Sequence, residues 1–275
     1  KRLNEQLSSG HKISTVSDDP PGSARVMRLK EEGASQALYR ENIQSVKSIY
    51  SNAASTLQSM STNLIQAKEL AVQGATTPYS AADRKGLAEQ VDGLLNTCVT
   101  EANLTVNGQY IFSGQTDQVT PYETTLDKGK ITDVTYQGSR ISTEVEIAPA
   151  RKGEINLVGQ EVLQTNSDMF QALIGLRDAL LADDRDAVRD QMGEIDAAHE
   201  DIRTSLSTFG GELNYLKTLD NVMEDFSLIT KEQISETYDA DYADLTSQYQ
   251  QQMTALQAIM KVATKAVPPS LADFI

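Results

Sequence analysis

Two distant stretches of the chain repeat apolar residues at alternating steps of three and four. In the first stretch the repeat runs without interruption through Ile43, Val46, Tyr50, Ala53, Leu57, Met60, Leu64, Ala67 and Ala71. In the second it runs through Val188, Met192, Ile195, Ile202, Leu206, Phe209, Leu213, Leu216 and Met223, and only His199 and Asp220 interrupt it. This spacing is the seam of a coiled coil, which needs a partner helix to cover it. The pattern therefore predicts that the two stretches pair as long helices, with the chain between them inserted.

Capping residues predict where the helices begin. Asp19 stands directly before a Pro-Pro pair, and an aspartate followed by proline is a typical helix start. No further proline follows in residues 22–74, so one long helix is expected there. Ser80 with Asp83 three residues later resembles a capping box and should open a second helix that ends near residue 103. The short link between the two helices predicts that they run antiparallel.

Gly210 and Gly211 lie inside the second seam. A glycine in a helix interior costs about 1 kcal/mol relative to alanine. The apolar spacing keeps its phase across the pair, so the helix should continue. We therefore expect another backbone to approach closely at these two positions.

From about residue 104 to 165 the apolar period changes from helical towards two. Asn107-Gly108 and residues 127–130 have the composition of turns, whereas residues 110–112 and 135–147 alternate as half-buried strands do. An insert of this size is near the lower limit for independent folding, so it should lean on the helices.

These boundaries predict a mainly α fold, an elongated antiparallel bundle of long coiled-coil helices with a small inserted β-rich domain. Residues 1–103 and 166–235 should form the N-terminal and C-terminal helical parts of the rod. The β-rich insert should occupy residues 104–165, and residues 236–275 should form a terminal assembly helix.

That last helix carries an apolar stripe of its own and should stop at Pro268-Pro269. The stripe consists of Tyr242, Leu245, Tyr249, Met253, Leu256, Met260, Ala263 and Val267. A matching amphipathic segment exists only as a remnant around Leu3 and Leu7, which is too short to cover it. Leu3, Leu7 and the stripe are therefore predicted to form an assembly interface, ordered when other molecules cover it.

Composition narrows the classes of function. The chain of 275 residues has 39% hydrophobic but only 5% aromatic residues, which favours thin helix seams over a wide globular interior. Its net charge of −15 argues against nucleic acid and against an anionic membrane surface as partners. No apolar run approaches the roughly 18–20 residues of a membrane span. The single cysteine, Cys98, excludes a disulfide within the chain and lies in a periodic run typical of a buried small hydrophobe.

The sequence contains no nucleotide-binding, metal-binding or hydrolase motif, so we expect no enzyme, no metal and no cofactor. His11 and His199 are the only strong acid–base candidates at neutral pH. His199 occupies a seam position where a polar residue can fix register. His11 lies in a polar loop without a paired carboxylate pattern. Asp239-Ala240-Asp241 could bind a cation, but capping of the final helix is the commoner use of such residues.

Several segments resemble flagellins and their relatives. The sequence LNEQLSSGHKI at residues 3–13, followed by SDDP at 17–20, is similar to the N-terminal signature of that family. The sequence FGGELNYL at residues 209–216 resembles the segment before its C-terminal helix. DYADL at 241–245 and QQQMTALQA at 250–258 resemble that helix itself. The resemblance is strong at both ends of the chain and weak in the middle.

Two further segments resemble the branch of the family that joins the flagellar hook to the filament. One is GQYIFSG at residues 108–114 with Pro121-Tyr122, and the other is the ending SLADFI at residues 270–275. This resemblance implies a non-enzymatic structural component of the bacterial flagellum, secreted to the hook–filament junction and assembled as a ring of subunits. It implies flagellin, the other junction protein and an export chaperone as partners. The family's chains usually start some way before Lys1, with a segment that pairs with the C-terminal helix.

Two other functions are compatible with the same residues. Flagellin with a small outer domain shares the helical ends, and it would polymerise alone into long filaments. A helical ligand-binding or sensor module would instead use the insert as its binding site, and convergent polar residues there would support it. An enzyme is the least favoured alternative.

Overall fold

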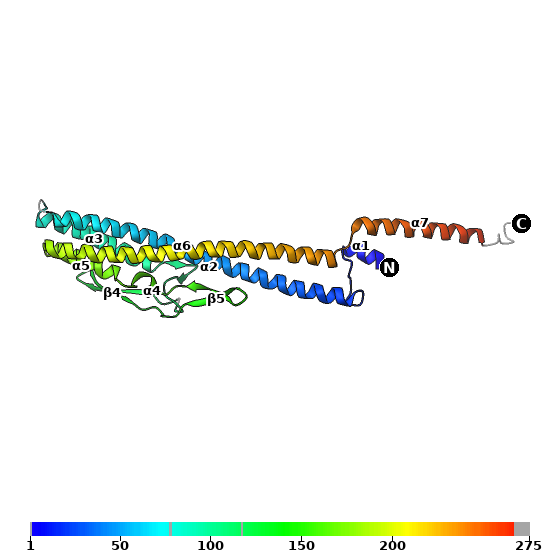
Figure 1. The fold of residues 1–275 in the computed structure, drawn as a ribbon, viewed down its shortest axis with the longest axis horizontal. Coiled ribbons are helices and arrows are strands. Elements are labelled where there is room, and N and C mark those ends of the chain that lie inside the picture. The colour runs from blue at the N-terminus through cyan, green and yellow to red at the C-terminus, as the bar shows by residue number, and fades with distance from the viewer. Residues whose placement is uncertain (1, 77–78, 117, 267–275) are drawn as a thin grey trace. The chain divides into compact units, whose positions relative to one another are not determined.

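A computed structural model describes residues 2–76, 79–116 and 118–266, with only the backbone described for residues 264–266 (Figure 1). The chain forms two compact units, one made of Lys1–Ala37 with Glu224–Ile275 and the other of Leu38–Met223. The helices are α1 (Arg2–Ser9), α2 (Pro20–Ala75), α3 (Ala81–Ala102), α4 (Gly159–Leu163), α5 (Met169–Leu181), α6 (Arg185–Tyr238) and α7 (Tyr242–Ala266). The strands are β1 (Thr105–Val106), β2 (Gln109–Tyr110), β3 (Tyr122–Asp127), β4 (Lys130–Tyr136), β5 (Thr143–Ala148) and β6 (Arg151–Asn156). Long helices with a small inserted β-rich region confirm the predicted fold class.

The larger unit is built around the antiparallel pair of α2 and α6. Near the middle of α2, Arg40 Nε lies 3.3 Å from Asp220 Oδ1, and further along α2 the ammonium of Lys68 pairs with Asp196. The partner's residue number falls as the number along α2 rises, so the two helices run in opposite directions. Helices α3 and α5 pack against each other beside them (Figure 1). One hydrophobic core runs through all four helices.

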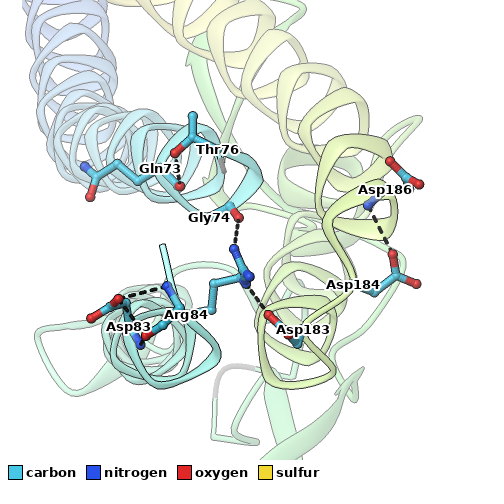
Figure 2. Close-up of polar contacts among 9 residues, drawn as sticks. Gln73, Gly74, Thr76, Asp83, Arg84, Asp183, Asp184 and Asp186 are labelled. Atoms are coloured by element: carbon cyan, nitrogen blue, oxygen red, sulfur yellow. Dashed lines mark hydrogen bonds and ion pairs between the residues drawn. The ribbon is translucent and has the colours of Figure 1, made fainter. Parts of the chain in front are cut away.

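Arg84 joins three helix ends at the tip of this bundle (Figure 2). Its Nη1 donates to the carbonyl oxygen of Gly74, 3.2 Å away, in the last turn of α2. Its Nε donates to the carboxylate of Asp183, in the turn between α5 and α6. The Arg84 side chain itself lies in the first turn of α3 and is buried. The single guanidinium therefore donates to a carbonyl oxygen at the C-terminal end of α2 and also forms an ion pair with a carboxylate.

Caps close the same helix ends. Ser80 and Asp83 form the predicted capping box, since the Ser80 hydroxyl accepts from the Asp83 N–H and the Asp83 carboxylate accepts from the Ser80 N–H (Figure 2). Asp184 Oδ1 accepts from the backbone N–H groups of Asp186 and Ala187, each at 3.1 Å, and so caps α6.

The insert consists of three antiparallel hairpins, β1–β2, β3–β4 and β5–β6. Two of them turn at Asn107-Gly108 and Lys128-Gly129, where all four residues have positive φ, as tight hairpin turns require. The predicted strand over residues 110–112 is wrong beyond Tyr110. Ile111 and Phe112 lie in a turn with their side chains buried, and their carbonyl oxygens accept from the N–H groups of Leu157 and Gly159 instead of continuing a strand.

The insert leans on the helices, as expected from its size. Asn42 of α2 donates to the Glu146 carbonyl of β5 at 2.7 Å. A methyl group added to Gly153 of β6 would lie 3.1 Å from a Val46 methyl, so this hairpin lies directly on α2. Strand β4 is held by Arg177 of α5, whose Nη1 donates to the Ile131 carbonyl at 2.5 Å.

The expected close approach at Gly210 and Gly211 is wrong. A Cβ added at either position would meet no described atom within 4 Å, although α6 runs through the pair unbroken. The apolar seam faces the core on both sides of the pair, at Phe209 and Leu216. The two glycines themselves point away from it, so this chain supplies no neighbour for them.

We therefore predict opposite effects for two glycine substitutions. Gly210→Ala with Gly211→Ala should raise the free energy of unfolding by about 1–2 kcal/mol, since alanine favours the helix and meets nothing. Gly74→Ala should lower it by about 1–3 kcal/mol, because its Cβ would overlap the buried Leu180 side chain. Urea unfolding followed by circular dichroism measures both. Equal effects of the two changes would contradict this packing.

Candidate assembly surfaces

The predicted seam residues of the larger unit lie in its hydrophobic core. All nine from Ile43 to Ala71 are buried. On α6 the buried ones are Val188, Ile195, Ile202, Phe209, Leu216 and Met223, while Met192, Leu206 and Leu213 are half-buried against the same core. His199, one of the two polar interruptions, places Nε2 2.8 Å from the Ser61 hydroxyl of α2, and Asp220, the other, pairs with Arg40. The structure thus brings the two stretches together, with a hydrogen bond where the second stretch loses its apolar repeat.

In the smaller unit, residues 10–12, which follow α1, form hydrogen bonds with the turn between α6 and α7. The Lys12 N–H donates to the Tyr238 carbonyl at 2.7 Å, and the Ala240 N–H donates to the Gly10 carbonyl at 3.0 Å. The imidazole of His11 stacks on Tyr238, with ring centroids 4.1 Å apart. The backbone and the ring contact together fix the place where α7 begins.

His11 also has the carboxylate partner that its sequence surroundings did not indicate. Its Nδ1 lies 3.3 Å from Asp239 Oδ1, so the interpretation of His11 as lacking a paired carboxylate is wrong. The two residues are 228 positions apart in the sequence, and only the fold brings them together. Asp241, next along, caps α7 by accepting from the N–H groups of Ala243 and Asp244. No group of three or more metal-ligating side chains occurs in the described part of the chain.

The predicted assembly interface divides into a covered part and an open part. Helix α1 packs against α7, where Leu3 and Leu245 are buried and Leu7 is half-buried. The other described stripe residues are exposed. The large ones, Tyr242, Tyr249, Met253, Leu256 and Met260, range from 40% for Tyr249 to 59% for Met260, and Ala263 is exposed as well. Val267, the prolines expected to end the helix and the 270–275 ending lie outside the described residues.

Two exposed residues of α7 were missed because they lie off the heptad stripe. Ile259 and Val262 are 64% and 67% exposed, compared with 59% for Met260 of the stripe. A count of all apolar residues around the helix, rather than one face, would have found them. The described end of α7 therefore presents apolar side chains on more than one face, which a partner can cover only by surrounding the helix.

Cys98 is buried in α3, as its periodic position predicted. Burial, helped by the nearby Glu101 carboxylate, raises the pKa of its thiol to about 12. The thiol is therefore protonated at neutral pH and acts as a small apolar side chain.

Asp201 of α6 fastens the loop that precedes α5. Its carboxylate accepts from the N–H and side-chain amide of Asn166 and from the N–H and hydroxyl of Ser167, at 2.7–3.1 Å. Burial by itself would raise the pKa of Asp201, but these hydrogen bonds outweigh it and hold the pKa below its usual value.

Asp201→Asn should therefore lower the free energy of unfolding by about 1 kcal/mol at pH 7. A depressed carboxyl pKa stabilises the fold above the unfolded-state pKa, near 4, and that stabilisation is lost as the pH falls through the folded-state pKa. The difference between wild type and variant should accordingly shrink from pH 7 to pH 3 in urea unfolding. A difference that stays constant over this range would contradict the assignment.

None of the described helices is long and apolar enough to cross a membrane. Residues 1–117 match the family model of the bacterial flagellin N-terminal helical region. The chain is 26% identical to the flagellar hook-associated protein 3 of Escherichia coli over 288 aligned residues, which cover 96% of this chain and 89% of that protein. The chain is thus similar to flagellin-like proteins at its N-terminal end and to a flagellar hook-associated protein along nearly its whole length.

Solved structures share the fold of this chain. FlgL of Xanthomonas campestris aligns with a TM-score of 0.66 at 16% identity, over 75% of this chain and 99% of that one. The flagellar junction protein FlgL of Legionella pneumophila aligns with a TM-score of 0.63 at 15% identity, over 78% of this chain and 100% of that one. At these identities the likeness establishes the fold. The sequence similarity that extends over nearly the whole chain, insert included, is the similarity to the hook-associated protein of Escherichia coli.

Proposed function

We propose that this chain is a structural subunit of the bacterial flagellum that joins the hook to the filament. The observation that carries the proposal is the alignment with hook-associated protein 3, which runs through 96% of the chain and so includes the insert as well as the helical ends. Those relatives are structural flagellar proteins rather than enzymes. The chain acts through its surfaces, and catalysis has no part in this function.

The structure suggests how such a subunit is held. The larger unit has a continuous core of its own, in which the two predicted seams meet. Helix α7 has no such cover beyond Leu245, and its side chains from Tyr249 to Ala263 are exposed. Burial stabilises by roughly 25 cal/mol per Å² of apolar surface, so neighbours that surround α7 would gain substantially. We infer that the two seams hold the subunit together and that α7 with α1 holds it in the assembly.

Several partners follow from this role. Flagellin would lie on one side of the subunit, the other junction protein on the opposite side, and further copies of the chain beside it in a ring. An export chaperone would cover the α7 stripe before secretion, because an exposed apolar helix otherwise aggregates. The subunit would act outside the cell, at the hook–filament junction.

Hooks isolated without their junction proteins test the proposal. The chain, added with the other junction protein, should bind in a limited layer, and flagellin should then grow filaments from hooks that it could not extend before. Hooks that bind no added protein, or that flagellin extends equally well without it, would contradict a junction role.

Flagellin itself is the second candidate, favoured by the flagellin N-terminal model that matches residues 1–117. The same experiment separates the two. A filament subunit would polymerise alone into long filaments once seeded, whereas a junction subunit stops after a short layer.

A further inference from the structure

The larger unit has a groove of about 340 Å³ between α6 and the segment that runs from β6 through α4. Its floor is apolar and consists of Tyr50, Leu157, Val158, Val162 and Phe209, all of them buried. The rings of Tyr50 and Phe209 meet edge to face, with centroids 5.0 Å apart. The groove is thus a formed cavity with an aromatic wall, large enough to admit a long side chain.

Its lining is strongly acidic. Glu154, Glu161, Asp201 and Glu212 line it, and no lysine or arginine does. Asp201 is engaged with the loop before α5, and Glu154 accepts from the hydroxyls of Ser142 and Tyr50. Glu161 and Glu212 have no ion-pair partner among the described residues. Burial, together with the Glu154 and Glu212 carboxylates, raises the pKa of Tyr50, so its hydroxyl stays protonated.

An apolar floor below unpaired carboxylates suits a particular kind of side chain. Arginine combines an aliphatic stem, which packs on apolar surface, with a planar cation that stacks on aromatic rings and binds carboxylates in pairs. A bare metal ion suits the groove less well, because the described residues contain no cluster of three ligating side chains.

The first turns of α2 carry the complementary charge. Residues 20–30 contain Arg25, Arg28 and Lys30 and no acidic residue. Lys30 lies over the Tyr238 ring, 4.7 Å from its centroid, whereas Arg25 and Arg28 are exposed and form no ion pair within the described chain. Arg25 and Arg28 are three positions apart, so they lie on the same side of α2. Two neighbouring exposed cations without a partner in the described chain are available to carboxylates of another molecule.

We propose that this groove receives the Arg25 and Arg28 side chains of α2 from a second copy of the chain. The stem of an arginine would pack on Tyr50 and Phe209, and its guanidinium would pair with Glu212 and Glu161. This inference rests on the proposed assembly of several copies at the junction, and it names the contact between neighbouring copies.

Charge reversal tests this contact with the full-length chain and isolated hooks. Glu212→Arg alone, and Arg25→Glu with Arg28→Glu, should each lower the amount of chain bound per hook at least tenfold, since like charges then meet across the contact. All three changes together should restore binding to within about threefold of wild type. Glu194→Arg, and Lys217→Glu with Lys231→Glu, are controls that match the two variant sets in charge change at exposed positions of α6, and they should alter binding less than twofold.

The arginine variants remain informative about binding because they should not unfold the chain. Arg25 and Arg28 are exposed helix positions, and glutamate forms helices about as well as arginine, so α2 should be kept, which circular dichroism melting checks. If both variant sets bind hooks as well as wild type does, the proposed contact is overturned and the junction role still stands. If Glu212→Arg lowers binding to hooks but the two arginine changes do not, the groove receives a different protein. If all three changes together fail to restore binding, Glu212 does not pair with Arg25 and Arg28. Failure of wild type to bind hooks would overturn both proposals.

Discussion

Replacing Arg177 with alanine should lower the free energy of unfolding by about 3–5 kcal/mol, the largest stability effect expected of any single substitution discussed here. Its side chain is only 2% exposed. It donates to Asp92 of α3 at 3.0 Å, to Asp178 at 2.8 Å and to the Ile131 carbonyl of β4 at 2.5 Å. Burial alone would lower the pKa of Arg177, but the hydrogen bonds to both carboxylates raise it, so the side chain is charged in the fold.

The stability lost in Arg177→Ala has two causes, lost packing and lost polar contacts, and a second variant separates them. Arg177→Ala leaves a cavity and also leaves the Ile131 carbonyl and the half-buried Asp92 without their cation. Arg177→Met fills most of the cavity, so it should lose less than half as much stability if packing dominates. Urea unfolding measures both changes. Arg189→Ala, which removes an exposed pair with Asp186, is the matched control and should cost less than 0.5 kcal/mol. A loss below about 1 kcal/mol for Arg177→Ala would contradict the role of this cluster in joining β4 to the helices.

The helical part of the larger unit could be read from the sequence because burial on a long helix follows local spacing. Every position of the first stretch, from Ile43 to Ala71, is buried at the predicted step. The caps at Ser80 and Asp184 were equally local, since each involves residues two or three positions apart. Such features depend on a few consecutive residues, which is the information that a single sequence carries.

Contacts between distant residues could not be read in the same way. Arg177 stands beside Asp178 in an otherwise apolar run, and its other partners Asp92 and Ile131 are 85 and 46 positions away. His11 and Asp239 are further apart still. Nothing in the local pattern of either residue distinguishes a paired side chain from a solvated one. The acidic groove was missed for the same reason, because β6, α4 and α6 contribute its carboxylates from separate parts of the chain.

The glycine pair of α6 shows a different limit. The seam phase across Gly210 and Gly211 correctly predicted an unbroken helix, yet the partner inferred for them is absent from the described chain. A pattern can indicate that a surface is shaped for close approach without indicating which molecule approaches. The same holds for α7, whose apolar stripe was predicted from the sequence and is exposed beyond Leu245 in the described chain.

Replacing Met253 and Leu256 with aspartate should abolish assembly while leaving the free chain intact. Both side chains are exposed on α7, so the free energy of unfolding of the isolated chain should change by less than about 0.5 kcal/mol. In the assembly each side chain would be buried, where a Met or Leu contributes about 1.5–3 kcal/mol. Losing two such apolar side chains, and burying a carboxylate in place of each, should weaken binding to hooks by about a thousandfold. Ser247→Asp with Gln251→Asp adds the same charge at polar positions of α7 without removing apolar side chains, so it should weaken binding much less and serves as the control.

Hydrogen exchange checks the same helix without any substitution. Beyond Leu245, α7 buries no described side chain, so its amides should exchange rapidly in the free chain, since local opening there exposes almost no new apolar surface. In the assembled layer the same amides should be protected, because opening would then uncover the apolar residues from Tyr249 to Ala263. Slow exchange after Tyr249 in the free chain would mean that α7 is stabilised within the subunit. The exposed stripe could then no longer explain how the subunit is held, and the aspartate variants would be expected to unfold the free chain as well.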